Sequence, residues 1–329
     1  MRSLRSLPSV LAGAVLAFAV AAPAAADDHD GFTIKDPRIV ESSGLAASRA
    51  HPGVYWTHND QDKGAFLYAV DSRTGRTVAT ITMTGVGAPR DVEAISVGSD
   101  GNIYVGDIGD NLNGTWSNVW VYKLPEPKKL TDQTVRATQY VVKYADGARD
   151  AEALMVHPKT GRLYIVSKNE DGGGLYESPE RMSASGTNVF RRIADIDLWV
   201  TDGAFSPNGE QLALRGYFGG IWYAWQGEGK KPQRKGRLSV PLQRQGESVT
   251  YTLDGTTLMY GTEGEQSAVT PVEAPGGGEG GKSPSGDGGS DDGGGGSGVD
   301  GGFRTGAIVL GAVLLAVFGL KRLSRRGGK

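Results

Sequence analysis

The chain contains no cysteine and only four histidines, and these absences exclude several kinds of active site. Without cysteine there is no thiol nucleophile and no cysteine-ligated zinc site. The sequence also lacks a G-x-S-x-G elbow, a P-loop and an H-E-x-x-H motif. A Ser–His–Asp triad is not supported, because His29, His51 and His157 fall in an expected frayed end and in loops. No catalytic residue is assigned from the sequence.

Strong charge of either sign is missing too. The formal net charge is −2, and no basic stripe stands out in the part of the chain expected to be exported. Proteins that bind nucleic acid usually show such a stripe, so nucleic acid is not an expected partner.

Apolar runs stand near both ends of the chain. Residues 1–26 have the parts of a secretory signal peptide: basic Arg2 and Arg5, an apolar stretch, and a small-residue exit ending at Ala26. Residues 305–320 form an uncharged apolar run, and with Phe303 and Arg304 they predict a transmembrane helix over 303–320. The basic tail 321–329 places the C-terminus in the cytoplasm. We expect a single-pass protein of the cell membrane whose main domain is extracellular. An uncleaved N-terminal anchor and a processed C-terminal helix are the alternatives.

Between these ends lie two regions of different composition. Residues 275–302 consist almost entirely of Gly, Ser, Asp and similar residues, which cannot form a core and predict a flexible linker. Residues 27–274 remain as the folded domain, which is large enough to fold without disulfides.

This domain shows no long helical periodicity. Instead, short runs of Val, Ile, Tyr, Trp and Thr alternate with turn residues, and the pattern repeats. The first strand of each repeat reads SGLAA from 43, EAISV from 93, EALMV from 152, TDGAF from 201 and ESVTY from 247. These spacings are close to the length of one four-stranded propeller blade.

Further strands follow in each repeat. The expected fourth strands are 77–83, 134–143, 189–196 and 233–240, and the last repeat has no room for one before the linker. Residues 31–40 read as an extra strand that would complete the last blade and close the ring, which removes open sheet edges. The fold class is therefore an all-β propeller of five four-stranded blades, or six if the long repeat from 93 to 152 contains another. An irregular β-sandwich is the alternative.

Polar residues gather where first strands start and second strands end, and antiparallel pairing puts both places at one mouth of the central channel. Oxygen-rich clusters suit Ca²⁺ or Mg²⁺, and Ca²⁺ is the cofactor we expect if the site holds a metal. The metal ligands we predict are Glu93, Asp107, Asp110, Asn111 and Glu152. The residues we predict to bind another ligand are His58, Asn59, Asp60, Lys168, Arg215, Glu247 and Glu263.

Each of these residues also has a structural interpretation. Asp91 and Asp150 can accept backbone N–H bonds at loop ends. Glu93, Glu152 and Glu247 can pair with Arg90, Lys168 or Arg215. His58 can be an ordinary loop histidine.

Several segments carry a resemblance to a known family. ESSGLAAS (41–48), GVYWTHND (53–60), RDVEAISV (90–97), IYVGDIGDN (103–111), RDAEALMVHP (149–158) and LYIVSKNEDGGGLY (163–176) resemble the secreted WD40-like propeller proteins of Gram-positive bacteria. More distantly, they are similar to esterase-like or phytase-like propellers. The resemblance covers about residues 38–265, and it implies a propeller fold and a surface location. Similarity to the phytase-like group implies Ca²⁺ on one face of the channel and phosphate bound there by basic residues. In this sequence, Lys168 and Arg215 are the basic residues at the corresponding place.

Three functions follow from these observations. A surface-displayed module would bind an extracellular protein, a glycan or a small ligand at the channel mouth, and the long linker suits display. A Ca²⁺-dependent phosphoester or ester hydrolase would use the same carboxylates to hold metal and activate water. A structural envelope protein would need no ligand. Binding is the function we expect, and the hydrolase is the alternative.

Overall fold

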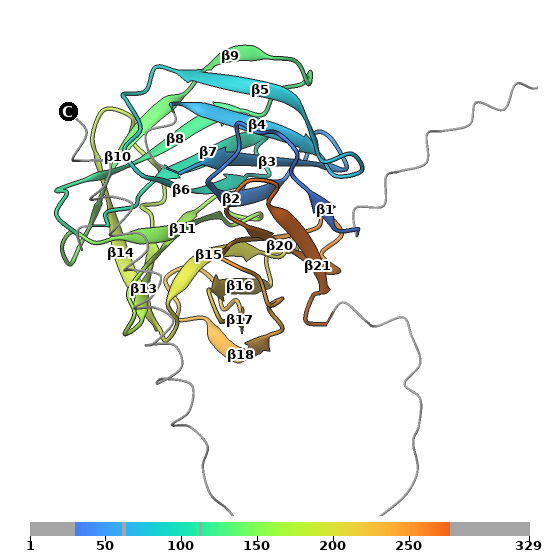
Figure 1. The fold of residues 1–329 in the computed structure, drawn as a ribbon. Coiled ribbons are helices and arrows are strands. Elements are labelled where there is room, and N and C mark those ends of the chain that lie inside the picture. Colours follow the sequence, from blue (N-terminus) through green and yellow to red (C-terminus); the bar gives the residue numbers. More distant parts are fainter. Residues whose placement is uncertain (1–29, 61–63, 112–113, 277–329) are drawn as a thin grey trace, which may run out of the picture.

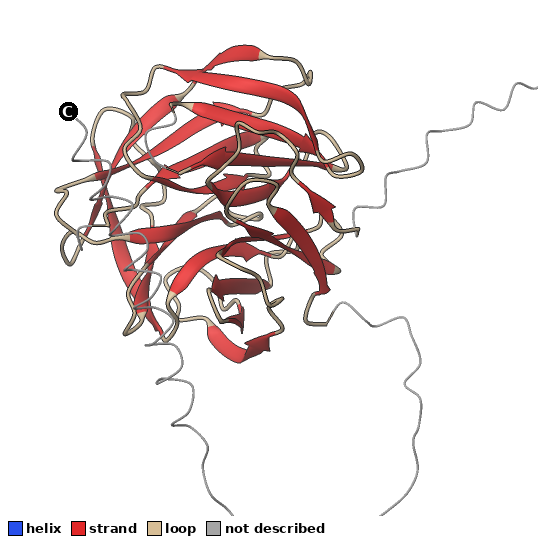
Figure 2. Ribbon diagram, viewed as in Figure 1, coloured by secondary structure: helices blue, strands red, loops and turns tan. Residues whose placement is uncertain are grey.

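The computed structural model describes residues 30–60, 64–111 and 114–276, and this part of the chain is built from β-strands joined by loops (Figures 1 and 2). None of the described residues belongs to a helix long and apolar enough to cross a bilayer. The predicted signal peptide (1–26), the linker after Gly276, the predicted transmembrane helix (303–320) and the tail (321–329) lie outside the described residues.

The strands form repeated units, which we number along the chain and which are antiparallel within each unit. The last strands of units 2 and 3 pair in parallel and join these two units into one eight-stranded sheet. Unit 1 contains β2 (Ser42–Ala47), β3 (Val54–Asn59), β4 (Phe66–Asp71) and β5 (Arg76–Thr84). Unit 2 contains β6 (Val92–Val97), β7 (Asn102–Asp107), β8 (Val119–Pro125) and β10 (Thr138–Tyr144). Unit 3 contains β11 (Ala151–Val156), β12 (Leu163–Ser167), β13 (Gly173–Glu177) and β14 (Thr187–Ile196). Unit 4 contains β15 (Val200–Phe205), β16 (Gln211–Gly216), β17 (Gly219–Ala224) and β18 (Gln233–Leu238). Unit 5 contains β19 (Gly246–Tyr251), β20 (Thr257–Thr262), β21 (Ala268–Glu273) and β1 (Phe32–Thr33).

The first strands of these units contact one another in a closed cycle. β2 lies against β6, β6 against β11, β11 against β15, β15 against β19, and β19 against β2. The last unit is completed by the N-terminal strand, because β1 pairs with β21 through Phe32 and Val269. This all-β, propeller-like arrangement places the start of every first strand near one central axis.

The core is divided among the junctions between units. Trp56 and Leu67 of unit 1 pack with Ile95 of unit 2, and Phe32 of unit 5 packs with Tyr55 of unit 1. Corresponding clusters join units 2 and 3, units 3 and 4, and units 4 and 5. First strands are therefore largely buried on both faces, and their polar residues are buried with the apolar ones.

One expected strand divides into two. The sequence predicts a single strand over 134–143, whereas the structure has β9 (Gln133–Arg136), then the buried Ala137, then β10. β9 pairs in parallel with β5 of unit 1, and β10 pairs with β8 of unit 2. The extra length of the repeat from 93 to 152 is used in part to add this fifth strand to the neighbouring sheet.

Candidate functional site

Every first strand carries a β-bulge at the same place. The pairing register between first and second strands breaks between Ser42 and Leu45, and at the matching point of the other four units. A bulge inserts an extra residue and turns its side chain in a new direction. The residues at the bulges are buried, and we call them the mouth ring: Ser43, Glu93, Glu152, Thr201 and Glu247.

The second strands contribute an equivalent position. The residue just after each second strand is Asp60, Ile108, Lys168, Tyr217 and Glu263 in units 1 to 5. Backbone bonds hold three of these against the start of their own unit, for example Asp60 N to Glu41 O at 2.8 Å and Lys168 N to Asp150 O at 2.9 Å. A carboxyl group in unit 1 thus occupies the place that an ammonium group has in unit 3.

Lys168 is the cation of one half of the mouth ring. Its Nζ lies 2.6 Å from Glu152 Oε1 and 3.1 Å from the Tyr217 hydroxyl. Burial alone would lower the pKa of Lys168, but the charges of Glu152 and its other acidic neighbours outweigh it and raise that pKa well above the usual value. Burial raises the pKa of Glu247 to about 7, although Lys168 opposes the shift. This half of the mouth ring therefore contains a permanent positive charge.

The other half contains three carboxyl groups, Asp60, Asp91 and Glu93, which we call the carboxyl trio. One oxygen of each lies within 4.8 Å of one oxygen of each of the other two. Burial, followed by repulsion from Asp91 and Glu152, raises the pKa of Asp60 well above its usual value. Burial and repulsion from Asp60 do the same for Glu93, and burial raises the pKa of Asp91 to about 6.

Hydrogen bonds satisfy this trio only in part. Glu93 Oε2 accepts a bond from the Ser43 hydroxyl at 2.8 Å, and Asp91 Oδ2 accepts one from the Asn111 amide at 3.0 Å. Oδ1 of Asp60 and Oδ1 of Asp91 are buried and have no hydrogen-bond partner among the described residues. Two buried oxygens without a donor are costly unless something else fills the space between them.

The loop after β7 supports the trio. Asp107 accepts bonds from the backbone N–H of Arg90 and of Asp91 and from the Tyr122 hydroxyl, so its carboxylate fixes the start of β6. The Asp110 carboxylate accepts the Thr115 hydroxyl and the backbone N–H of Trp116.

Gly109 of the same loop comes very close to the trio. A Cβ atom at this residue would lie 2.7 Å from Asp91 Oδ2 and 2.8 Å from Glu93 Cγ. Of the predicted metal ligands, Glu93 belongs to the trio and Asn111 donates to it. Glu152 binds Lys168 instead. Asp107 and Asp110 accept hydrogen bonds from backbone groups near the trio.

Arg215 connects units 4 and 5. Its side chain is fully buried and donates to the carbonyls of Ser248 and Gly261, both at 2.7 Å, and to the side-chain oxygen of Gln243 at 2.8 Å. Burial lowers its pKa to about 10. A Cβ atom on Gly246 would overlap the guanidinium, so glycine is needed there. The structure thus uses Arg215, predicted to bind ligand, as an internal support.

Three further residues predicted to bind a ligand are held by contacts within their own units. His58 is buried with its Nδ1 3.2 Å from the Asn59 carbonyl, and burial lowers its pKa to about 4. The Asn59 side chain accepts the backbone N–H of Val40 and of Glu41. Glu263 accepts a bond from the Gln245 side chain at 2.8 Å. Of all the residues predicted to bind a ligand, only Asp60 belongs to the carboxyl trio.

The opposite end of the central axis differs in character. A cavity of about 60 Å³ there is lined mostly by small and apolar side chains, among them Leu45, Ile95, Ala204 and Val249, with Ser96 and Thr250 beside them. Arg49 and Tyr251 also line this cavity, but no carboxyl group does, so the glutamates of the mouth ring all lie at the other end.

Sequence reasoning missed two contributors. Asp91 was not among the predicted metal ligands, yet it belongs to the trio; its signal was its place two residues before Glu93. Asp150, at the matching place of unit 3, does accept the backbone N–H of Asp110. Tyr217 was not selected, although it follows Arg215 at the end of β16 and contacts Lys168.

No protein-family profile matches the chain, and no curated protein matches it. Solved structures match over the folded part. They include a hydrazine synthase from Kuenenia stuttgartiensis (13% identity, TM-score 0.38, 67% of this chain and 61% of that one) and a putative 6-phosphogluconolactonase from Bacteroides uniformis (12%, 0.40, 71% and 68%). A third is a putative oxidoreductase (glucose dehydrogenase) from Thermus thermophilus (12%, 0.42, 73% and 85%). The chain spans about three fifths of the hydrazine synthase chain. These likenesses carry no argument about the activity of this chain.

Proposed function

We propose that this protein is a five-bladed propeller displayed on the cell surface, and that it binds Ca²⁺ at the mouth ring as part of binding an extracellular ligand. Each of the five units described above would be one blade. The predicted signal peptide, linker and C-terminal helix support display outside the membrane. A glycan, a protein or a small molecule remains open as the ligand.

The observation that carries this proposal is the uneven distribution of charge around the mouth. Lys168 stands beside Glu152 and Glu247, whereas the carboxyl trio of Asp60, Asp91 and Glu93 has no lysine or arginine ion pair among the described residues. Buried carboxylates that repel one another are stable only with protons or with a cation. A divalent cation would replace the protons and relieve the repulsion.

The chemistry of the donor set suits calcium. The trio offers only carboxylate oxygens, which are the ligands that Ca²⁺ and Mg²⁺ prefer. Oδ1 of Asp60 and Oδ1 of Asp91 are buried without a donor, so they are available to a metal. Calcium takes six to eight oxygens, which leaves coordination positions for water or for oxygens of the bound ligand.

The experiment is a thermal melt of the full chain in mild detergent with EDTA, with Ca²⁺ and with Mg²⁺. A ligand that binds only the folded state raises the melting temperature, by an amount equivalent to about 2.7 kcal/mol at a hundred times its Kd. We expect a rise with Ca²⁺ that disappears in Asp60→Asn and in Glu93→Gln. Glu273→Gln, an exposed carboxylate at the far end of β21, should keep the rise. A melting temperature that Ca²⁺ does not change would contradict the proposal. So would a Ca²⁺-dependent rise that is still present in both Asp60→Asn and Glu93→Gln.

A Ca²⁺-dependent hydrolase is the second candidate, and the raised pKa of Asp91 favours it. A carboxyl group with a pKa of about 6 beside further carboxyl groups can take up a proton near neutral pH, as a general base does. We would measure release of nitrophenol from p-nitrophenyl phosphate and p-nitrophenyl acetate with Ca²⁺ present. Turnover that is lost in Asp91→Asn would establish the hydrolase; absence of turnover beside an intact Ca²⁺ shift leaves the binding function.

A further inference from the structure

A second hollow lies away from the mouth, on the outer part of unit 3. Its volume is about 440 Å³, which is within the range of small-molecule sites. It is formed by the residue before β12, the connection from β13 to β14, and β14 itself. We call it the outer groove, and its lining includes Arg162, Arg181, Arg191, Ser183, Thr187 and Val189.

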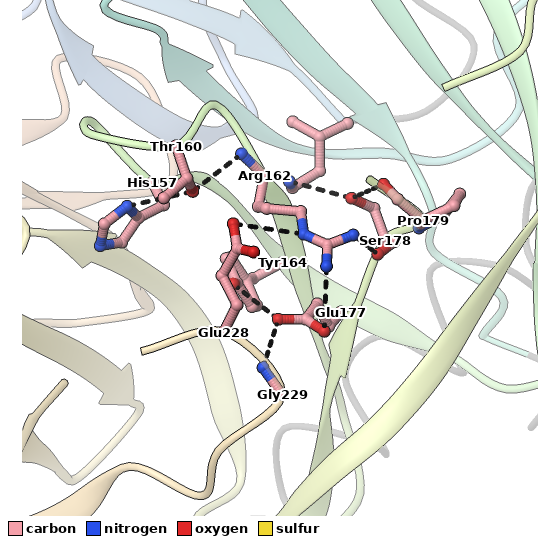
Figure 3. A network of polar contacts seen from close by, with 10 residues as sticks. His157, Thr160, Arg162, Tyr164, Glu177, Ser178, Pro179, Glu228 and Gly229 are labelled. Carbon is pink, nitrogen blue, oxygen red and sulfur yellow. Dashed lines mark hydrogen bonds and ion pairs between the residues drawn. The ribbon is translucent and has the colours of Figure 1, made fainter. Parts of the chain in front are cut away.

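One wall of the outer groove is a network of hydrogen bonds and ion pairs around Arg162, which Figure 3 shows from close by. Arg162 donates to the Ser178 carbonyl at 2.9 Å, and its guanidinium lies 3.7 Å from Glu177 and 3.4 Å from Glu228. Glu177 also accepts the Tyr164 hydroxyl and the backbone N–H of Gly229. The charges of Arg162 and Glu177 are thus paired within the protein. Their contacts with Glu228 and Gly229 hold the loop between β17 and β18 of unit 4 against unit 3.

The two other arginines of the groove are different. The side chains of Arg181 and Arg191 are exposed and make no hydrogen bond or ion pair with any described residue. The hydroxyl groups of Ser183 and Thr187, on the same lining, also make no hydrogen bond to the described residues. Two positive charges and two hydroxyl groups therefore face one hollow, and none of them has a partner in the described part of the chain.

The composition of the lining indicates the class of ligand. Guanidinium groups bind phosphate through paired hydrogen bonds, and two of them match the charge of a phosphate monoester, which approaches −2 at neutral pH. Val189 is 42% exposed in the same groove and offers an apolar surface to the body of such a molecule. Lys230 and Lys231, exposed residues that follow the anchored Gly229, add positive charge nearby.

We propose that the outer groove is a second binding site, separate from the mouth ring, and that it takes a phosphate monoester with a small organic body. Arg181 and Arg191 bind the phosphate, Ser183 and Thr187 donate further hydrogen bonds, and Val189 contacts the body. The site does not depend on the proposed calcium site, so either can fail alone.

Calorimetric titration of the full chain with phenyl phosphate at pH 8 tests the site, with phenyl sulfate as the matched ester of lower charge. EDTA is present throughout, so that the mouth ring holds no calcium. We expect phenyl phosphate to bind more tightly than phenyl sulfate. Arg181→Ala and Arg191→Ala should each raise the Kd about tenfold or more, because hydrogen bonds between charged groups are among the strong ones. Arg234→Ala, which removes an equally exposed arginine from β18, should leave the Kd unchanged.

Three results would overturn the proposal. The first is no heat of binding with millimolar phenyl phosphate. The second is equal affinity for the two esters. The third is an equal loss of affinity for phenyl phosphate in Arg181→Ala, Arg191→Ala and Arg234→Ala. Either of these two results would mean general attraction to a basic surface. A separate arm uses vesicles containing phosphatidic acid. If the protein binds these vesicles and phenyl phosphate displaces it from them, the monoester is a lipid headgroup. If the protein binds phenyl phosphate but not the vesicles, the monoester is a soluble molecule.

Discussion

Nζ of Lys168 lies 2.6 Å from Oε1 of Glu152, and this ion pair is buried at the mouth of the ring. Lys168 comes from the end of a second strand and Glu152 from the bulge of the first strand of the same unit. The same two positions in unit 1 hold Asp60 and Ser43, so no such pair forms there. Units that share one fold therefore place opposite charges at equivalent positions, and this difference creates the carboxyl trio.

The first prediction concerns Lys168. In Lys168→Met the carboxyl groups of Glu152 and Glu247 lose their cation, and we expect a loss of about 3 to 5 kcal/mol in the free energy of unfolding. Urea denaturation measures it. Lys159→Met, which removes an exposed lysine paired with Glu210 at 3.5 Å, should change stability by no more than about 0.5 kcal/mol.

A double variant separates the charge effect from a packing effect. Lys168→Met combined with Glu152→Gln removes both members of the pair and should be less destabilised than Lys168→Met alone. If the double variant is the worse of the two, Lys168 supports the mouth by packing and not by charge.

The repeated pattern of the sequence was sufficient to predict the units, and it aligned the residues of the mouth ring. Glu93, Glu152, Thr201 and Glu247 begin the repeats that the sequence shows, and all four lie at bulges in the structure. This works because the apolar pattern fixes the register of each first strand, so an extra polar residue at its start can only be accommodated as a bulge.

The parts that failed to emerge from the sequence depend on contacts between units. β9 lies in the repeat of unit 2 but pairs with β5, and local pattern cannot choose between two sheet edges. Arg215 looks like a residue of the mouth, but Ser248 and Gly261 of the next unit accept its hydrogen bonds. The arginines of the outer groove come from separate segments and form no stripe in the sequence.

The second prediction is a pH dependence due to Glu247. Burial raises the pKa of this residue from 4.5 to about 7, with Glu263 adding to the shift and Lys168 and Arg215 opposing it. A folded-state pKa above the unfolded value means that the folded state holds the proton longer. The stabilising contribution is therefore complete below about pH 4.5 and is lost as the pH rises through about 7, with a total of about 3 kcal/mol.

Urea denaturation at pH 5.5 and at pH 8, both with EDTA, tests this dependence. The native chain should lose more stability than Glu247→Gln between the two pH values, because glutamine does not titrate. Glu273→Gln should lose as much as the native chain, since that carboxylate is exposed. Equal slopes for the native chain and Glu247→Gln would show that Glu247 titrates normally.

The third prediction concerns Gly109, which lies between the supporting loop and the carboxyl trio. Its backbone is not in the left-handed region, so alanine is allowed conformationally, but the new Cβ would meet Asp91 Oδ2 at 2.7 Å and push the trio apart. We expect Gly109→Ala to fold and to lose most of the rise in melting temperature that Ca²⁺ causes. Gly219→Ala is the matched control, because a Cβ there meets nothing within 4 Å. If both alanine variants respond to Ca²⁺ like the native chain, calcium binds elsewhere, and the trio keeps its protons instead.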